Sequence, residues 1–497
     1  MNYISTRGNY PPVQAAEAIR LGMVPEGGLF VPGEVPQLSF EEINKHKHAD
    51  YQELATWILG YFLEDFSGQE LEEAVTTAYH SSNFPVEGVT PLVRLGDNTY
   101  ILELWHGPTA AFKDMALQLM PELLVRAVKK SGIDREVVIL VATSGDTGKA
   151  ALEGFKGVDG IRIIVFYPEA GVSQIQEDQM ITTGGNNTEV VAVRGNFDDC
   201  QTAVKGVFGD RDFNRTLKQN GYQFSSANSI NWGRLVPQIV YYFAAYLNLL
   251  EAGKIEERQL IDIVVPTGNF GNILAGYYAS RMGLPVNKFI CASNENKVLT
   301  DFLRTGVYDI KRDFKKTISP SMDILISSNL ERFLFEVTGH DSQKIRYWYN
   351  QLREQGGFEI DSGTLKEIQS LFVGEFARET EVKQIIKTTF EQYNYLVDPH
   401  TGVGLSCLQS LRKARLSDRI TVVDSTANPF KFGRAVLEAL TGEVQEGDDY
   451  LILERLQEFT GWELHRGLAG LRTASPRHSR NCRPTGVPAE IEDILGL

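Results

Sequence analysis

The chain has 497 residues, of which 42% are hydrophobic and 23% charged, so it can bury a large core and does not have the composition of a disordered or fibrous protein. Its formal net charge of −15 disfavours non-specific binding to nucleic acid or to an anionic membrane, because both are polyanions. No stretch approaches the roughly 18 consecutive apolar residues of a membrane span.

Neither the amino terminus nor the cysteines suggest an extracellular protein. The segment MNYISTRGNYPP contains no basic stretch followed by an apolar run, so we expect a cytoplasmic location. The cysteines are far apart and lack the spacing of metal ligands, which argues against a metal site or a disulfide framework. They are Cys200, Cys291, Cys407 and Cys482.

The first predicted unit is a small helical region. Between residues 40 and 79 apolar residues such as Leu54, Ile58 and Phe62 recur at helical spacing, separated by charged and polar positions. From about Val89 onward the pattern changes to short apolar runs, each followed by a glycine-rich turn and a longer amphipathic stretch. This alternation predicts an α/β fold.

The third feature in chain order is the segment His106 to Asp114, HGPTAAFKD, which precedes a stretch with helical periodicity. Lys113 is therefore expected in the first turn of a helix, where the helix dipole disfavours a cation. That field, together with partial burial beside Phe112, would lower the pKa of the amine and make it nucleophilic toward an aldehyde. The alternative is a surface lysine that pairs with a neighbouring acidic residue.

Buried strands are predicted at residues 137–142, 161–167 and 261–266, which are apolar at nearly every position. Such strands are typical of parallel sheets that helices cover on both faces, and ligands bind beyond the carboxyl ends of those strands. The turn TSGDTG, residues 143–148, follows the first of them. Its hydroxyl groups and N–H donors at a helix start could hold a carboxylate or a phosphate oxygen. The spacing of a nucleotide-hydrolysing P-loop is absent, although Lys149 follows the turn.

A second glycine turn, TGNFGN at residues 267–272, follows the strand 261–266. Two glycines between a strand and a helix allow successive N–H groups to point at one position, which suits a phosphate. The turn could equally be no more than a tight connection. The next segment, from about Asp301 to Arg378, is rich in charges and aromatics, and we interpret it as a helical covering layer or insertion.

A lysine and two anion-binding turns at one edge of a sheet are what an aldehyde cofactor with a phosphate group and an amino-acid substrate require. The motifs FKD, SGDTG, NSINWGR, GNFGN and STANPFKF occur in this order. In that order they resemble the threonine synthases, within the tryptophan-synthase-β-like group of enzymes that use pyridoxal 5'-phosphate (PLP). The resemblance runs from YISTRG near the amino terminus to LAGLRTASPRH, and its most specific segment is NSINWGRLVPQIVYYF, residues 228–243.

The resemblance implies PLP fold type II, with two open, mostly parallel sheets, flanking helices and a helical amino-terminal region. The implied units are residues 1–88, a smaller lobe at 89–225 with the PLP lysine, and a larger lobe at 226–497 with the phosphate loop and the insertion at about 301–378.

The resemblance also implies roles for individual residues in cofactor binding. Lys113 is similar to the Schiff-base lysine of the family. Asp146 stands where relatives place an asparagine near the cofactor's ring hydroxyl, and Thr426 resembles the hydroxyl residue that faces the pyridine nitrogen. The residues that match the phosphate loop are Gly268, Asn269, Phe270, Gly271 and Asn272.

Substrate-binding residues are implied in the same way. Ser144 and Thr147 would hold the substrate carboxylate, and Asn228, Ser229 and Arg234 its phosphate. The planar guanidinium of Arg234 can donate two hydrogen bonds to one phosphate, although a structural ion pair is its alternative role. The chain departs from the usual STAHPAKF motif at Asn428 and Phe430, which affects the detail of that loop.

The activity implied is the conversion of O-phospho-L-homoserine and water to L-threonine and phosphate. A small-molecule substrate is expected, with no nucleic-acid or membrane partner, and the protein is expected as a monomer or homodimer. One rival is a phospho-lyase that forms 2-oxobutanoate, ammonia and phosphate from the same substrate. The other is a PLP-binding protein without catalytic activity.

Overall fold

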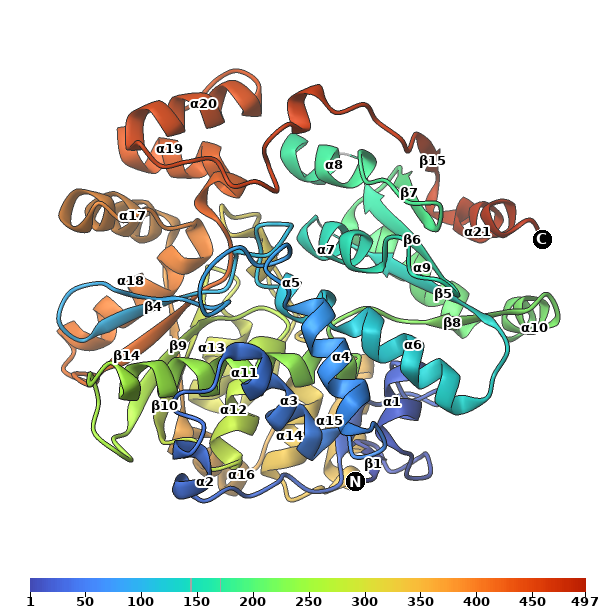
Figure 1. Cartoon of the computed structure of the whole chain (residues 1–497), viewed down its shortest axis with the longest axis horizontal. Helices are drawn as coiled ribbons and strands as arrows, with labels where there is room; N and C mark the ends of the chain where they lie inside the picture. Colours follow the sequence, from blue (N-terminus) through green and yellow to red (C-terminus); the bar gives the residue numbers. More distant parts are fainter. Residues whose placement is uncertain (144, 170) are drawn as a thin grey trace.

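The computed structural model of the chain describes residues 1–143, 145–169 and 171–497, and its two large sheets lie in separate lobes (Figure 1). The smaller sheet has the order β15-β7-β6-β5-β8, and all its pairings are parallel. Its strands are β5 (Glu136–Ala142), β6 (Ile161–Pro168), β7 (Thr188–Val193), β8 (Tyr222–Ser225) and β15 (Arg480–Cys482).

The larger sheet has the order β13-β10-β9-β14-β4-β3 and is parallel except for the pair β3 and β4. Its strands are β3 (Leu92–Arg94), β4 (Thr99–Glu103), β9 (Ile261–Pro266), β10 (Val286–Ser293), β13 (Phe372–Phe376) and β14 (Thr421–Ser425). The predicted α/β fold with two mostly parallel sheets is confirmed.

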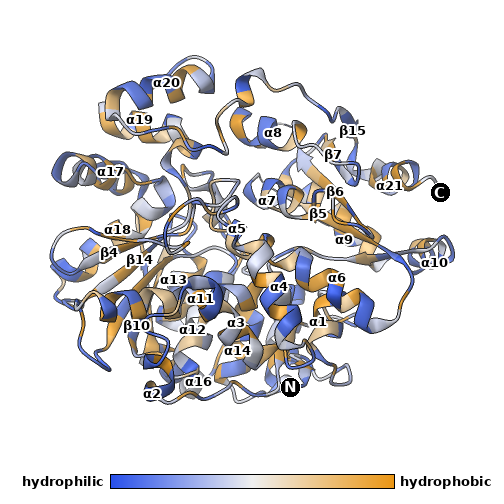
Figure 2. Ribbon diagram, viewed as in Figure 1, coloured by the Kyte–Doolittle hydropathy of each residue, from blue (hydrophilic) through white to orange (hydrophobic). Residues whose placement is uncertain are grey.

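The central strands are buried on both faces, as their uninterrupted apolar sequences predict. In β5, Val137 and Ile139 belong to the main hydrophobic core, whereas Val138 and Leu140 belong to a separate core on the opposite face. Figure 2 shows the corresponding hydrophobic strands inside each lobe, with the more hydrophilic helix faces turned outward. The helices that cover the smaller sheet are α6 (Met120–Ser131), α7 (Asp146–Phe155), α8 (Gln174–Ile181), α9 (Phe197–Gly209), α10 (Arg211–Gln219) and α21 (Val487–Leu495).

The amino-terminal region is mainly helical and packs against the larger lobe. Leu54, Ile58 and Phe62 form the buried side of α3 (Tyr51–Phe62), which contacts α11 (Trp232–Glu251). Its other elements are β1 (Tyr3–Ser5), α1 (Ala15–Leu21), β2 (Phe30–Pro32), α2 (Phe40–Asn44) and α4 (Gly68–Ala78).

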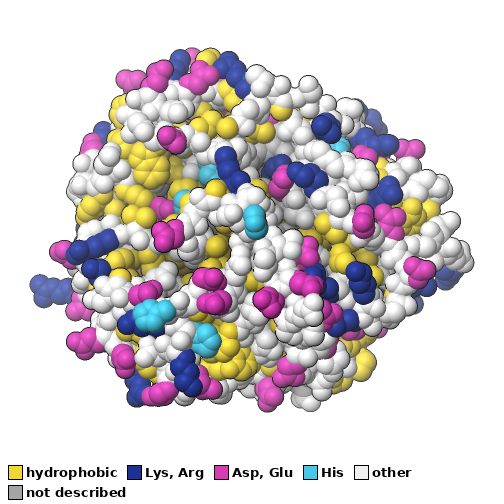
Figure 3. Space-filling model, viewed as in Figure 1, with side chains coloured by type: hydrophobic (Ala, Val, Ile, Leu, Met, Phe, Trp, Pro, Cys, Tyr) yellow, Lys and Arg dark blue, Asp and Glu magenta, His cyan; other side chains and the backbone are white. Residues whose placement is uncertain are grey.

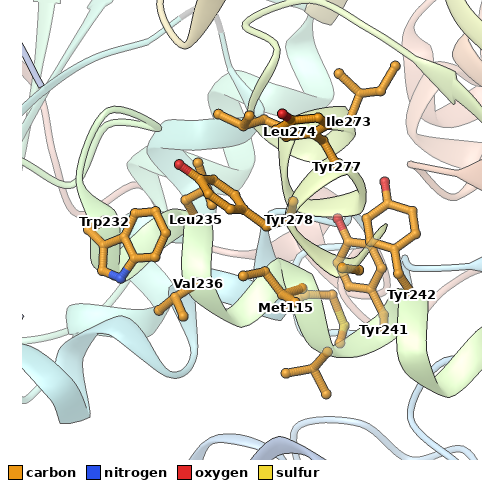
Figure 4. Packing of buried hydrophobic residues seen from close by; sticks show 14 of the residues in the cluster. Met115, Trp232, Leu235, Val236, Tyr241, Tyr242, Ile273, Leu274, Tyr277 and Tyr278 are labelled. Atoms are coloured by element: carbon orange, nitrogen blue, oxygen red, sulfur yellow. The ribbon is translucent and has the colours of Figure 1, made fainter. Parts of the chain in front are cut away.

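Helix α11 lies at the centre of the main core and supports the phosphate loop predicted from the sequence. Figure 4 shows Tyr241 and Tyr242 side by side on α11, close to residues of α12 (Gly271–Arg281). The two tyrosine rings are 4.8 Å apart between centroids. Close packing of these two helices fixes the position of the loop that precedes α12.

Some strands belong to a different sheet from the one that the predicted lobe boundaries imply. Strands β3 and β4 lie within residues 89–225 but join the larger sheet, and β15 at the carboxyl end joins the smaller one. Residues 301–378 are mostly helical, yet they also supply β13 at the edge of the larger sheet. Strands of three to five residues are too short for their hydrophobic period to identify them in a sequence.

Most of the remaining elements cover the larger lobe or connect its strands, and two 3₁₀ turns near the carboxyl end pack against α8, α9 and α21 of the smaller lobe. They are α5 (Asp114–Leu117), α13 (Val298–Thr305), β11 (Val307–Asp309), α14 (Leu330–Val337), α15 (Ser342–Gln355), β12 (Gly357–Glu359), α16 (Ser362–Leu371), α17 (Glu379–Tyr393), α18 (Pro399–Lys413), α19 (Gly433–Thr441) and α20 (Asp449–Thr460), with short 3₁₀ turns η1 (Pro320–Met322), η2 (Pro429–Phe432), η3 (Leu471–Thr473) and η4 (Pro484–Gly486). Within the described residues, no helix has the length and apolar character needed to cross a membrane. On the face drawn in Figure 3, acidic and basic side chains are interspersed.

Candidate active site

Lys113 immediately precedes the single-turn helix α5, so the predicted long helix is divided into α5 and α6. Its side chain is only 12% exposed, and its Nζ lies 4.9 Å from the centre of the Phe112 ring. Burial is the main cause of a lowered pKa for this amine, and the charges of Lys431 and Arg234 add to it, whereas Asp146 opposes it. The predicted nucleophilic amine is therefore consistent with its surroundings.

The loop that carries Lys113 is joined to the loop after β14. Ala111 and Ala427 form an antiparallel bridge, and the Phe112 N–H donates to the Thr426 carbonyl at 2.8 Å. The Asn428 N–H donates in turn to the carbonyl of Ala110 at 3.0 Å. These bonds bring the candidate lysine and the candidate hydroxyl residue Thr426 together, although they lie more than 300 positions apart.

Asp114 stabilises the same loop from within. Its carboxylate accepts hydrogen bonds from the Thr109 N–H at 2.8 Å and from the Thr109 hydroxyl at 2.7 Å. Burial raises its pKa to about 6 in spite of these bonds. The aspartate of FKD is thus a structural residue that closes the loop in front of Lys113.

The turn after β5 presents Asp146 to Lys113. Asp146 begins α7, and its Oδ2 lies 3.4 Å from the Lys113 Nζ. The Thr143 hydroxyl accepts hydrogen bonds from the N–H groups of Gly145 and Gly148, so these two donors are already occupied. Thr147 is half-buried in the first turn of α7, whereas Ser144, the other predicted carboxylate-binding residue, lies outside the described residues.

Lys149, which also follows this turn, lies away from the lysine loop. Its Nζ pairs with Glu153 at 2.9 Å and donates to the Thr183 hydroxyl at 3.0 Å. The side chain is thus engaged within the smaller lobe, in agreement with the rejection of a P-loop.

The phosphate loop connects β9 to α12, as predicted. Phe270 has φ of 60°, in the left-handed region, and this conformation directs the chain into the first turn of α12. The first N–H groups of a helix have no acceptor within the helix and carry the positive end of its dipole. A Cβ atom added to Gly271 would have as its nearest neighbour the Asn329 Nδ2 at 3.4 Å, which is ordinary contact, so the protein leaves space at this turn.

Three residues of the segment 301–378 hold the phosphate loop in place. The Ser327 hydroxyl donates to the Gly268 carbonyl at 2.8 Å, and the Ser328 hydroxyl donates to Asn269 Oδ1 at 3.1 Å. Asn329 Nδ2 donates to the Asn269 carbonyl at 3.0 Å and to the Ser229 hydroxyl at 3.3 Å. These three residues were not predicted, because nothing in a charged, aromatic segment indicates which of its polar side chains contact another loop.

Asn272 fastens the end of the loop to the core. Its Oδ1 is within hydrogen-bond distance of the hydroxyl groups of Tyr241 and Tyr242, the latter at 2.6 Å, and the Tyr242 hydroxyl oxygen also lies 2.9 Å from Asp424 Oδ2. These contacts make Asn272 an anchor of the loop, and they place the buried carboxyl group of Asp424 next to that anchor.

Arg234 lies in the first turn of α11 and is 4% exposed. Its Nη1 donates to the Ala227 carbonyl, and its buried Nε has no hydrogen-bond partner among the described residues. No carboxylate in the described part of the chain forms an ion pair with it, so the alternative role as a structural ion-pair partner has no support. Burial lowers its pKa to about 10, which leaves the guanidinium charged at neutral pH.

The half-buried residues Asn228 and Ser229 lie near this arginine in sequence, and Ser229 also lies beside the predicted phosphate loop in space. Ser229 Cβ would be 3.9 Å from a Cβ on Gly271, and its hydroxyl is held by Asn329. The structure thus brings Ser229 and the phosphate loop together through contacts within the protein.

These residues fit a phosphate-bearing aldehyde such as PLP. Lys113 supplies an amine with a lowered pKa, and the first turn of α12 supplies unoccupied space and N–H donors at a glycine. The buried guanidinium of Arg234 forms no ion pair with a carboxylate of the described residues, and its Nε has no hydrogen-bond partner there, which favours an anion bound beside it. The fold and the site together define an enzyme of the class that uses PLP.

Comparison with known proteins agrees with this class. Residues 2–79 match the model of the threonine synthase N terminus, and residues 84–424 match that of pyridoxal-phosphate dependent enzymes. The chain belongs to the threonine synthase family of pyridoxal-phosphate dependent enzymes, as its sequence motifs predicted. Its cofactor is pyridoxal 5'-phosphate.

Individual relatives show how far the similarity extends. Threonine synthase of Pseudomonas aeruginosa is 36% identical over 487 residues, which cover 97% of this chain and 100% of that protein. The structure of PLP-bound threonine synthase from Brucella melitensis aligns with a TM-score of 0.87 at 36% identity and covers 100% of both chains. Threonine synthase-like 1 of Macaca fascicularis is 43% identical over 88% of this chain, but the match spans only 60% of that relative.

Proposed function

We propose that the chain converts O-phospho-L-homoserine and water to L-threonine and phosphate. The observation that carries this proposal is Arg234, a buried guanidinium without an ion-pair partner in the described structure, near the Lys113 amine. A buried unpaired charge is costly, so its presence favours a site that an anionic substrate group completes. Similarity to threonine synthases over nearly the whole chain supports the identity of that substrate.

In this proposal Lys113 is the catalytic residue. PLP, when bound to its amine, withdraws electrons from the substrate carbons that react. The Lys113 amine removes the proton from the substrate α-carbon and assists proton transfer at the β-carbon, which requires the amine to be unprotonated at the working pH. Its burial and the charges of Lys431 and Arg234 favour the unprotonated form.

The remaining predicted residues are assigned to binding. Asp146 and Thr426 would contact the cofactor ring, and residues Gly268 to Asn272 its phosphate, through the N–H groups at the start of α12. Ser144 and Thr147 would bind the substrate carboxylate at the start of α7. Arg234, Asn228 and Ser229 would bind the substrate phosphate, and Arg234 would stabilise its negative charge as the C–O bond breaks.

A product analysis tests the proposal. The purified, PLP-loaded protein is incubated with O-phosphohomoserine in ¹⁸O-enriched water, and threonine, phosphate and 2-oxobutanoate are quantified. The proposal predicts equal amounts of threonine and phosphate, with the label in the threonine hydroxyl group. A PLP-loaded protein that forms neither threonine nor 2-oxobutanoate would contradict it and would favour the non-catalytic alternative.

The phospho-lyase that acts on the same substrate is the rival enzyme activity left open by the sequence. In that reaction phosphate leaves and the substrate ends as 2-oxobutanoate and ammonia, so 2-oxobutanoate would replace threonine in the product analysis. The cytoplasmic location and the monomeric or homodimeric state stay predictions of the sequence.

A further inference from the structure

The carboxylate of Asp146 receives four polar contacts from elements that are far apart in the chain. Lys113 and Ser321 contact its Oδ2 at 3.4 and 3.3 Å. Gln176 and Lys431 contact its Oδ1 at 2.9 and 3.1 Å. Because Asp146 begins a helix of the smaller lobe while Ser321 and Lys431 lie on turns of the larger lobe, this carboxylate joins the two lobes at the candidate active site.

Lys431 is the most deeply buried cation that contacts this carboxylate, and no role was predicted for it from the sequence. Its side chain is 0% exposed, and its Nζ donates to the Thr109 carbonyl at 2.8 Å besides its contact with Asp146. It lies on the turn η2, where the Asn428 side chain accepts from the Phe430 N–H at 3.0 Å. The turn therefore presents the ammonium group in one direction, toward Asp146 and the loop of Lys113.

The charged groups around Lys113 shift the pKa of its amine in opposite directions. Burial lowers its pKa most, Lys431 and Arg234 lower it further, and Asp146 raises it. Burial also opposes the ionisation of Asp146, but Lys431, Lys113 and the hydrogen bond from Gln176 hold the pKa of that carboxyl group well below its usual range. The ionised form of Asp146 therefore depends on these neighbours.

We propose that Lys431 is a positioning residue: its ammonium group holds and neutralises the Asp146 carboxylate, so that this carboxylate stabilises a proton on the neighbouring Lys113 amine less strongly. Without Lys431, the buried carboxylate would have Lys113 as its nearest cation and would retain a proton on that amine. The proposal rests on the role assigned above to Lys113, but it concerns the amine itself and not the substrate.

Trace acetylation of the full-length chain, freed of cofactor, tests the proposal. Only an unprotonated amine reacts with acetic anhydride, so the rate at Lys113, followed by mass spectrometry as the pH is varied, reports its protonation. Lys431→Met, which removes the charge but retains the length of the side chain, should shift the midpoint of this profile upward. Near neutral pH the labelling should slow by about tenfold for each unit by which the pKa of the amine rises.

Two controls separate this effect from a general loss of structure. Lys431→Arg keeps the charge and should leave the midpoint close to that of the parent. Lys149→Met removes another buried lysine from the helix that Asp146 begins, but Lys149 pairs with Glu153, so the midpoint at Lys113 should not move. In the PLP-loaded forms, the pH dependence of the visible absorbance should shift in the same direction as the labelling profile.

Asp146→Asn should shift the labelling midpoint in the opposite direction, and this test does not require Lys431→Met to fold. Removal of the carboxylate charge should shift the labelling midpoint of Lys113 downward and speed its acetylation at neutral pH. The proposal is overturned if Lys431→Met lowers the melting temperature and leaves the midpoint unchanged, or if Asp146→Asn does not alter it. Both results are independent of which products the enzyme forms, so they do not depend on the proposed reaction.

Discussion

Arg234 allows substrate binding to be separated from cofactor binding at the level of one side chain. Arg234→Ala should leave PLP bound to Lys113 but lower kcat/KM for O-phosphohomoserine by about tenfold to a hundredfold, because a charge-assisted hydrogen bond contributes roughly 1.5 to 3 kcal/mol. Steady-state kinetics and the visible absorbance of the bound cofactor measure the two effects. Since the buried guanidinium lacks an ion-pair partner in the described structure, its removal should not lower the melting temperature.

Arg234→Lys is the matched control, and it should recover only part of the activity, because an ammonium group cannot reproduce the planar fork of arginine. Inorganic phosphate should compete with substrate in the parent and compete less well in Arg234→Ala. If the alanine variant instead unfolds at a lower temperature and binds phosphate as the parent does, Arg234 is a structural residue.

Gly271 and Gly268 differ in the space that an added side chain would have. A Cβ at Gly271 would meet protein atoms only at ordinary contact distance, whereas a Cβ at Gly268 would lie 2.6 Å from the Ser321 carbonyl oxygen. We therefore expect Gly271→Ala to weaken PLP retention, measured by dialysis and absorbance, with little change in the stability of the cofactor-free protein. Gly268→Ala should lower stability as well, and unchanged PLP affinity in Gly271→Ala would argue against a phosphate at this turn.

At the scale of elements, the carboxyl group of Asp424 near the end of β14 should make the stability of the protein depend on pH. Burial raises the pKa of Asp424 to about 7, from an ordinary value of 3.8. Because the folded state holds this proton more tightly than the unfolded state, the stabilisation is complete below the ordinary value and is lost as the pH rises through about 7. Over that window the free energy of unfolding should fall by a part of the roughly 4 kcal/mol that such a shift represents.

Asp424→Asn should remove this contribution, since an amide does not titrate in this range and its oxygen can still accept from Tyr242. Urea unfolding of the parent and the variant at several pH values gives the comparison, and the difference between them should change sign or size across the window. A constant difference at every pH would show that Asp424 is not the titrating group.

Only the strands with continuous apolar sequences could be predicted from the sequence. Strands β5, β6 and β9 could be predicted because each is a continuous apolar run, and the turns after β5 and β9 followed from them. Strands β13 and β15 could not be predicted. Strand β13 has only five residues, and the residues of β15, Arg480–Cys482, have no apolar pattern.

The candidate site shows the same limit. Lys113 and Arg234 stand in motifs and could be named from the sequence, and the structure adds the burial that lowers the pKa of each. Gln176, Ser321 and Lys431 meet Asp146 only after the chain has folded, and no local pattern indicates a contact between residues so far apart. Asn329 was missed for the same reason.

For the whole molecule, the cofactor should act as a link between the lobes. Asp146 of the smaller lobe contacts Lys431 of the larger lobe, and the bridge between Ala111 and Ala427 adds to the connection. PLP that binds only the folded state at about 100 times its dissociation constant should stabilise the protein by roughly 2.7 kcal/mol. The melting temperature by calorimetry should therefore be higher with PLP than without it, and identical values would show that PLP binds without coupling to folding.

Reduction of the PLP-loaded protein with borohydride, followed by peptide mapping, tests the central claim most directly. The reduced cofactor becomes permanently attached to the lysine that holds it, and the surroundings of Lys113 predict that this residue alone carries the modification. Lys149 and Lys431 are the other buried lysines near the turn of Asp146 and serve as internal comparisons. A modification found on either of them, with Lys113 unmodified, would contradict the assignment of the active site.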